Sequence, residues 1–122
     1  MAYPKYDPNA PMENRFLAAL PPEELERILP KLEEVELKFG EKIYERGGMI
    51  EYVYFPTGSL FSRLAVGPDE LTLEMGVVGR EGMMGYPVFV GDSRSEFRVI
   101  VLGSGKAMRM TAADFKFECK RD

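Results

Sequence analysis

The stretch VELKFGEKIYERGGMIEYVYFPTGSLFSRLAV, Val35 to Val66, decides the fold. It contains the short runs VELKF, KIY, YVYF and SLFSRLAV, which are rich in β-branched and aromatic residues. Such residues favour strands, and VELKF also alternates apolar with polar positions. Glycines stand between the runs, at Gly40, Gly47-Gly48 and Gly58, where turns are expected. The stretch therefore predicts β-strands joined by short turns.

Similar strand signals continue toward the C-terminus, in LTLEM, FRVIVL and MRM, which gives about eight short strands in all. Helical spacing occurs at three places: ENRFLAAL with Asn14 as N-cap, PPEELERILPKL, and TAADFKFECKRD with Thr111 as N-cap. Many short strands and few helices predict a mainly β protein, as a sandwich, a jelly roll or a small barrel.

The 122 residues are enough for one domain. Residues 1–12 contain Pro4, Pro8 and Pro11 and show no periodicity, so we expect a flexible N-terminal arm without regular structure there. Residues 13–122 are expected to form the β-domain.

The composition excludes several kinds of site. The chain has no histidine and a single cysteine, Cys119. A histidine-ligated metal site, a Ser-His-Asp triad and a Cys-His dyad all need histidine, and an iron–sulfur cluster needs about four thiolates. We therefore expect no catalytic residues, no metal site and no enzymatic activity.

Charge and hydropathy bear on partners and location. The formal net charge of -4 gives no whole-chain attraction to nucleic acid. No apolar run approaches the ~20 residues of a membrane span, and the proline-containing N-terminus does not have the pattern of a signal peptide. We expect a cytoplasmic protein that does not bind membranes.

The stretch GREGMMGYPVFVGDSRSEFR, Gly79 to Arg98, allows two interpretations. In the first, the amides around Gly82 to Gly85 bind an anion together with Arg94 and Arg98. In the second, the segment is a loop and short helix that cover the open end of the β-structure. The residues that would then pack into the core are Met83, Met84, Tyr86, Val88 and Phe89.

The order of these pieces resembles a known family. The residues that carry the resemblance are NRFLAALPPEELERILPKLEEVELKFGEKIYERGGMIEYVYFPTGSL, Asn14 to Leu60. Within them LPPEELERI precedes a G-E-x-I-Y strand, Glu-Arg-Gly and IEYVYFPTG, and GREGMMG and an Arg-Ser pair come later. Over Glu13 to Arg121 the chain is similar to the effector domain of the catabolite-activator (Crp/Fnr) superfamily of bacterial transcription regulators.

The resemblance implies a fold and a binding site. Such domains are double-stranded β-helices (jelly rolls) that bind a small effector, with N-terminal helices and a C-terminal helix. A glycine-rich turn and a short helix face a cyclic phosphate, an arginine pairs with it, and a glutamate binds the ribose. The implied effector is cyclic AMP, cyclic GMP or another small anion. The candidate ligand-binding residues are Gly82, Met83, Met84, Gly85, Arg94, Ser95 and Arg98.

The spacing departs from the family pattern, in which the glutamate precedes the arginine by about ten residues. The three pairings that this spacing offers each lack one group: Met84 with Arg94, Glu81 with Gly91, and Val88 with Arg98. Glu96 also places a negative charge beside the Arg94-Ser95 pair. We therefore expect a degenerate phosphate cassette.

Two functions are consistent with these observations. The first is the small-effector sensory domain of a Crp/Fnr-type transcription regulator. The family's dimerising helix and helix-turn-helix would follow Arg121, so we expect no direct DNA binding by this chain; a monomer and a homodimer both stay open. The alternative is a ligand-free structural or interaction module that keeps the fold, with its pocket closed by Met84 and Tyr86.

Overall fold

The computed structural model describes residues 7–89 and 93–120, without the side chains of Tyr86 and Phe89. Its strands are β1 (Glu33–Leu37), β2 (Lys42–Tyr44), β3 (Tyr52–Pro56), β4 (Leu60–Val66), β5 (Thr72–Val78), β6 (Arg98–Gly103) and β7 (Gly105–Thr111). Its helices are α1 (Arg15–Ala18), α2 (Pro22–Ile28), α3 (Tyr86–Phe89) and α4 (Ala112–Cys119), and its 3-10 turns are η1 (Ala10–Glu13), η2 (Leu29–Lys31) and η3 (Pro68–Glu70).

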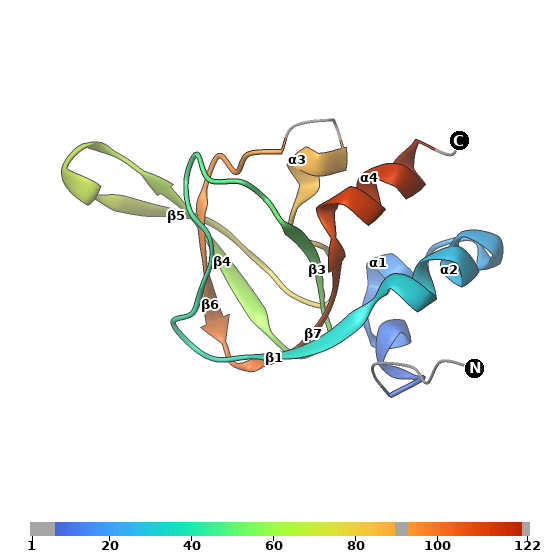
Figure 1. Cartoon of the computed structure of the whole chain (residues 1–122). Helices are drawn as coiled ribbons and strands as arrows, with labels where there is room; N and C mark the ends of the chain where they lie inside the picture. The colour runs from blue at the N-terminus through green and yellow to red at the C-terminus, as the bar shows by residue number, and fades with distance from the viewer. Residues whose placement is uncertain (1–6, 90–92, 121–122) are drawn as a thin grey trace.

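The strands form two antiparallel sheets that close into a roll. One sheet has the order β1-β7-β3 and the other the order β2-β6-β4-β5. Helices α1, α2 and α4 gather at one end of the roll, and the β4–β5 hairpin projects from the opposite end (Figure 1). The predicted mainly β jelly roll with N-terminal helices and a short C-terminal helix is therefore confirmed, with seven strands in the described residues.

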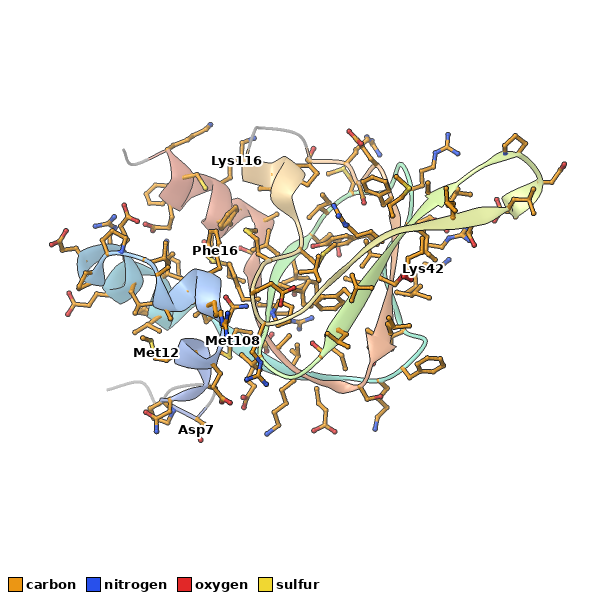
Figure 2. The ribbon with its side chains drawn as sticks, turned by 180° about the vertical axis from the view of Figure 1, so that it is seen from behind. Asp7, Met12, Phe16, Lys42, Met108 and Lys116 are labelled. Carbon is orange, nitrogen blue, oxygen red and sulfur yellow. The ribbon has the colours of Figure 1, made fainter. Side chains whose placement is uncertain are left out.

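Strand β3 divides the core into two parts. On one face Tyr54 packs against Phe61 of β4, with ring centroids 5.8 Å apart. On the other face Phe55 lies 5.8 Å from Phe16 of α1, labelled in Figure 2, and 6.3 Å from Phe115 of α4. Successive side chains of a strand point to opposite faces. The run YVYF is therefore apolar throughout because one face meets the roll interior and the other meets the helices.

The C-terminal helix is fixed at its start and along its side. Its predicted N-cap is confirmed, because Thr111 Oγ1 accepts a hydrogen bond from the Asp114 amide at 3.0 Å. Glu118 accepts hydrogen bonds from Lys31 at 2.6 Å and from Arg27 at 3.3 Å. These ion pairs connect α4 to the α2–η2 segment and support the packing of the helical end.

The expected absence of regular structure in residues 1–12 is wrong at the end of that segment. The turn η1 begins at Ala10, and both Ala10 and Pro11 are buried. Pro11 stands in the first turn of η1, where a proline loses no hydrogen bond and its fixed φ suits the helix. The folded body therefore begins before residue 13, whereas residues 1–6 lie outside the described residues.

Asn14 connects three segments that are distant in sequence. Its side chain is fully buried. The Oδ1 atom accepts from the Leu17 amide at 3.0 Å, which confirms the predicted N-cap. The Nδ2 group donates to the carbonyl of Pro56 at 2.7 Å and to that of Gly82 at 2.9 Å. One amide thus holds helix α1, the end of β3 and the glycine-rich turn together.

Replacing Asn14 tests this connection. We expect Asn14→Ala to lower the free energy of unfolding by about 2–4 kcal/mol, because the cap is lost and two carbonyls lose their partner. Asn9→Ala is the matched control, since Asn9 is exposed and its side chain makes no cap hydrogen bond to η1. The control should change stability by less than about 0.5 kcal/mol. Urea denaturation measures both, and equal effects would contradict the assignment.

Candidate functional site

A cavity of about 170 Å³ lies inside the roll next to the segment that leads into α3. Strands β2, β4, β5 and β6 contribute to its walls, together with residues on either side of 90–92. Much of the lining is apolar and includes Tyr44, Ile50, Val78, Met83, Phe97 and Val99. The charged residues in the described lining are Arg63 and Glu96.

The structure brings part of the predicted site together at this cavity. Four of the seven candidates line it: Met83, Met84, Gly85 and Ser95. Gly82 lies just before them, with its carbonyl bonded to Asn14. The described lining does not include Arg94 or Arg98. Gly91 and the side chains of Tyr86 and Phe89 lie outside the described residues, whereas Val88 is buried as the core-packing interpretation predicts.

Two amides of the predicted phosphate cassette already have backbone partners. The Gly82 amide donates to the Gly79 carbonyl at 3.1 Å. Met84 exchanges two hydrogen bonds with Tyr54 of β3, at 2.8 and 2.9 Å. Its side chain is buried. These bonds tie the segment to the roll, so an anion could use these two amides only by breaking them.

Gly85 supplies a conformation that other residues rarely adopt. Its φ is +108°, and a Cβ placed there would lie 2.6 Å from Val53 Cγ1 and 3.0 Å from the Tyr44 hydroxyl. That hydroxyl donates to the Tyr52 carbonyl at 2.6 Å. Burial raises the pKa of Tyr44 well above its ordinary value, so the phenol keeps its donor proton. Glycine is therefore required at position 85 both by its positive φ and because Val53 of β3 and Tyr44 of β2 lie so close to it.

The Arg94-Ser95 pair fastens a loop. Arg94 is exposed and its Nη1 donates to the Gly47 carbonyl at 2.8 Å, beside an isolated β-bridge between Arg94 and Met49. Ser95 is buried, and its hydroxyl donates to the Phe97 carbonyl at 2.7 Å. The pair thus holds the chain after residue 92 against the Gly47 turn.

Arg98 forms ion pairs on the outer side of the sheet. Its Nε lies 2.9 Å from Glu45 Oε2, and its Nη2 lies 2.9 Å from Glu70 Oε1. The hydrogen bond to Glu45, followed by that to Glu70, raises the pKa of Arg98 above its ordinary value. The same contact with Arg98 is the largest cause that lowers the pKa of Glu45 from 4.5 to about 2. Arg98 therefore serves as a bridge between two carboxylates.

Arg63 of β4 is the charged residue of the cavity that sequence reasoning missed. Its Nε is buried and has no hydrogen-bond partner among the described residues. Its guanidinium carbon lies 5.6 Å from the centroid of the Phe97 ring. Gly76, paired with Arg63 on β5, leaves the space for this group, since a Cβ there would lie 2.8 Å from Nη2. Because Arg63 stands two residues after the core residue Phe61, strand alternation could have placed it on the inner face.

A larger groove of about 520 Å³ lies between β3, α3 and α4 and includes Tyr52, Val88 and Lys116, the last labelled in Figure 2. It is open to solvent, and its described lining contains none of the seven candidates. The smaller cavity is the better candidate site, because its described lining includes four of them together with Arg63.

Two other kinds of feature are absent from the described residues. None of their helices has the length and apolar character needed to cross a membrane. They also contain no group of three or more Cys, Asp or Glu side chains placed to hold a metal ion.

Similar folds occur among solved structures. A regulatory subunit of a cAMP-independent protein kinase A from Trypanosoma brucei, a mutant bound to cAMP, superimposes with a TM-score of 0.78 at 15% identity, over 91% of this chain and 41% of that one. The N-terminal domain of a transcriptional regulator from Streptomyces coelicolor superimposes with a TM-score of 0.71 at 19% identity, over 92% of this chain and 78% of that one. The Thermus thermophilus catabolite activator protein superimposes with a TM-score of 0.72 at 12% identity, over 88% of this chain and 50% of that one.

These TM-scores establish the fold, which is that of cyclic-nucleotide-binding domains, including those of Crp/Fnr-type regulators. The chain spans about two fifths of the length of the kinase subunit. No protein-family model and no curated protein sequence matches the chain.

The requirement for glycine at position 85 can be tested against a second glycine with positive φ. Gly40 has φ +89° and nothing within 4 Å of the place that a Cβ would occupy, so Gly40→Ala measures backbone strain alone. We expect Gly85→Ala to lower the free energy of unfolding by about 2–4 kcal/mol, and Gly40→Ala by about 1 kcal/mol. Equal losses in thermal or urea denaturation would show that Val53 and Tyr44 do not restrict the site.

The ion pair between Arg98 and Glu45 predicts a pH dependence. Because the pKa of Glu45 is lowered to about 2, its contribution to stability is fully present above the ordinary value of 4.5 and is lost as the pH falls toward 2. In Arg98→Gln, carboxyl NMR titration should show the Glu45 pKa move back toward 4.5. Arg80→Gln is the control, because Arg80 is exposed and makes no contact with Glu45, and it should leave the Glu45 pKa unchanged. A low Glu45 pKa in both variants would exclude Arg98 as the main cause.

Proposed function

We propose that this chain is the small-effector sensory domain of a Crp/Fnr-type transcription regulator with a degenerate phosphate cassette. The observation that carries the proposal is the cavity beside Met83 to Gly85, whose described lining includes Arg63. The domain binds its effector without catalysis and acts in the cytoplasm. Its fold is shared with domains that include a cAMP-bound kinase regulatory subunit and bacterial regulators.

The packing offers a route from the cavity to the C-terminal helix. Met84 lines the cavity and is hydrogen-bonded to Tyr54 of β3. The next residue of β3, Phe55, packs against Phe115 of α4. A ligand that shifts the segment before α3 would therefore act on β3 and through it on α4, which is the element that would carry the signal onward.

Two features support a cassette that binds cyclic nucleotides weakly. The amides of Gly82 and Met84 are occupied by backbone carbonyls. The guanidinium of Arg94 donates to the Gly47 carbonyl outside the described cavity lining. A cyclic phosphate at this place would have to replace these bonds, so effectors other than cyclic AMP and cyclic GMP fit the site better.

The alternative is a ligand-free structural or interaction module. The size of the cavity favours it, since about 170 Å³ is less than the roughly 300–1,000 Å³ of pockets for drug-sized ligands. The burial of Met84 is a second observation in its favour, because this side chain fills the place beside the cassette.

Thermal denaturation with a panel of cyclic nucleotides and small organic anions separates the two functions. A ligand that binds only the native state at 100 times its Kd stabilises it by about 2.7 kcal/mol, so a true effector must raise the Tm. We expect at least one small anion to do so, and isothermal titration with cyclic AMP and cyclic GMP to show binding no tighter than millimolar. A Tm that is indifferent to the whole panel would reject the sensory domain and favour the structural module.

A further inference from the structure

Arg63 lines the cavity, and part of its guanidinium lacks a hydrogen-bond partner among the described residues. Its Nε is buried and without a hydrogen-bond partner among the described residues. Its strand neighbour Gly76 leaves room for Nη2, and the ring of Phe97 faces the guanidinium carbon at 5.6 Å. Leaving a buried donor unpaired is unfavourable. A structural arginine would be expected to have a carbonyl or carboxylate here, whereas a ligand-binding arginine would receive its acceptor from the ligand.

We propose that Arg63 is the anchor of the effector cavity and that the cavity takes a small carboxylate that carries one flat apolar ring. This inference rests on the proposed sensory function and specifies its ligand. The carboxylate would accept hydrogen bonds from the guanidinium, and the ring would lie among the apolar side chains of the cavity.

The size of the cavity determines the apolar part of the ligand. An apolar cavity of roughly 150 Å³ holds a benzene molecule, and the present cavity measures about 170 Å³. It therefore suits a single six-membered ring with a small substituent. A nucleotide, which carries a fused-ring base, a sugar and a phosphate, exceeds this space.

The charge of the cavity determines the polar part. Arg63 is the one cationic residue in its described lining, and the exposed carboxylate of Glu96 lies in the same lining. One guanidinium matches the two oxygens of a carboxylate, whereas a doubly charged phosphate group would keep uncompensated charge and be repelled by Glu96. A monoanion is therefore favoured.

The test uses benzoate as the probe and neutral benzamide as its isostere, with binding measured by isothermal titration and by the shift in Tm. Benzoate should bind the wild-type chain and raise its Tm, and benzamide should bind at least about tenfold more weakly. Arg63→Met, which removes the charge and keeps an unbranched side chain, should weaken benzoate binding by about tenfold or more. Lys38→Met is the matched control, because Lys38 is exposed and lies outside the cavity lining.

Two further variants probe the geometry. In Gly76→Ala the new methyl group displaces Nη2, so benzoate affinity should fall while the fold is kept. Glu96→Gln removes the negative charge from the lining, so affinity should rise. Without ligand, Arg63→Met should melt at a higher temperature than the wild type, because it removes a buried donor that lacks a partner in the described chain. A lower Tm for unliganded Arg63→Met would show that the arginine is structural and would overturn the inference.

The outcomes separate this inference from the proposed function. Benzoate binding that is equal in the wild type and Arg63→Met overturns the inference. The inference is also overturned if cyclic AMP binds, benzoate does not bind, and Arg94→Gln abolishes the binding of cyclic AMP. This second result would still support the sensory function. Binding of none of the probes, cyclic nucleotides included, rejects both.

Discussion

The side-chain amide of Asn14 is the contact on which the architecture of the site depends. It caps α1, satisfies the last carbonyl of β3 and holds the carbonyl of Gly82. A backbone hydrogen bond of 2.7 Å from the Arg15 amide to the Arg80 carbonyl supports the same junction. The N-terminal helices therefore position the glycine-rich turn, and this turn positions the residues that border the cavity.

The three arginines near the site show how neighbours decide what a cation does. Arg98 lies between the carboxylates of Glu45 and Glu70 and forms an ion pair with each of them. Arg94 donates to a main-chain carbonyl and fixes a loop. Arg63 lies over an aromatic ring with a buried Nε that lacks a partner in the described chain. The sequence motif singles out Arg94, but the cavity contains Arg63.

Features that depend on short distances along the chain were predictable, and those that depend on tertiary contacts were not. The caps at Asn14 and Thr111 involve partners three residues away, and the strands follow from residue type, so both were predicted correctly. The partner of Arg94 is Gly47, which no local pattern indicates. That Arg63 faces inward can be inferred from strand alternation only once Phe61 is known to face the interior. The prediction of no regular structure up to residue 12 was wrong because a proline in the first turn of a helix, as Pro11 is in η1, does not interrupt it.

The surroundings of Gly85 restrict which residue this position can hold. A Cβ at this position would lie 2.6 Å from Val53 Cγ1 of β3 and 3.0 Å from the Tyr44 hydroxyl of β2, so it would crowd both strands. The cavity therefore has bare main chain at Gly85, whereas the neighbouring lining residues Met83 and Pro87 carry side chains. At this point the shape of the cavity is set by the main chain rather than by a side chain.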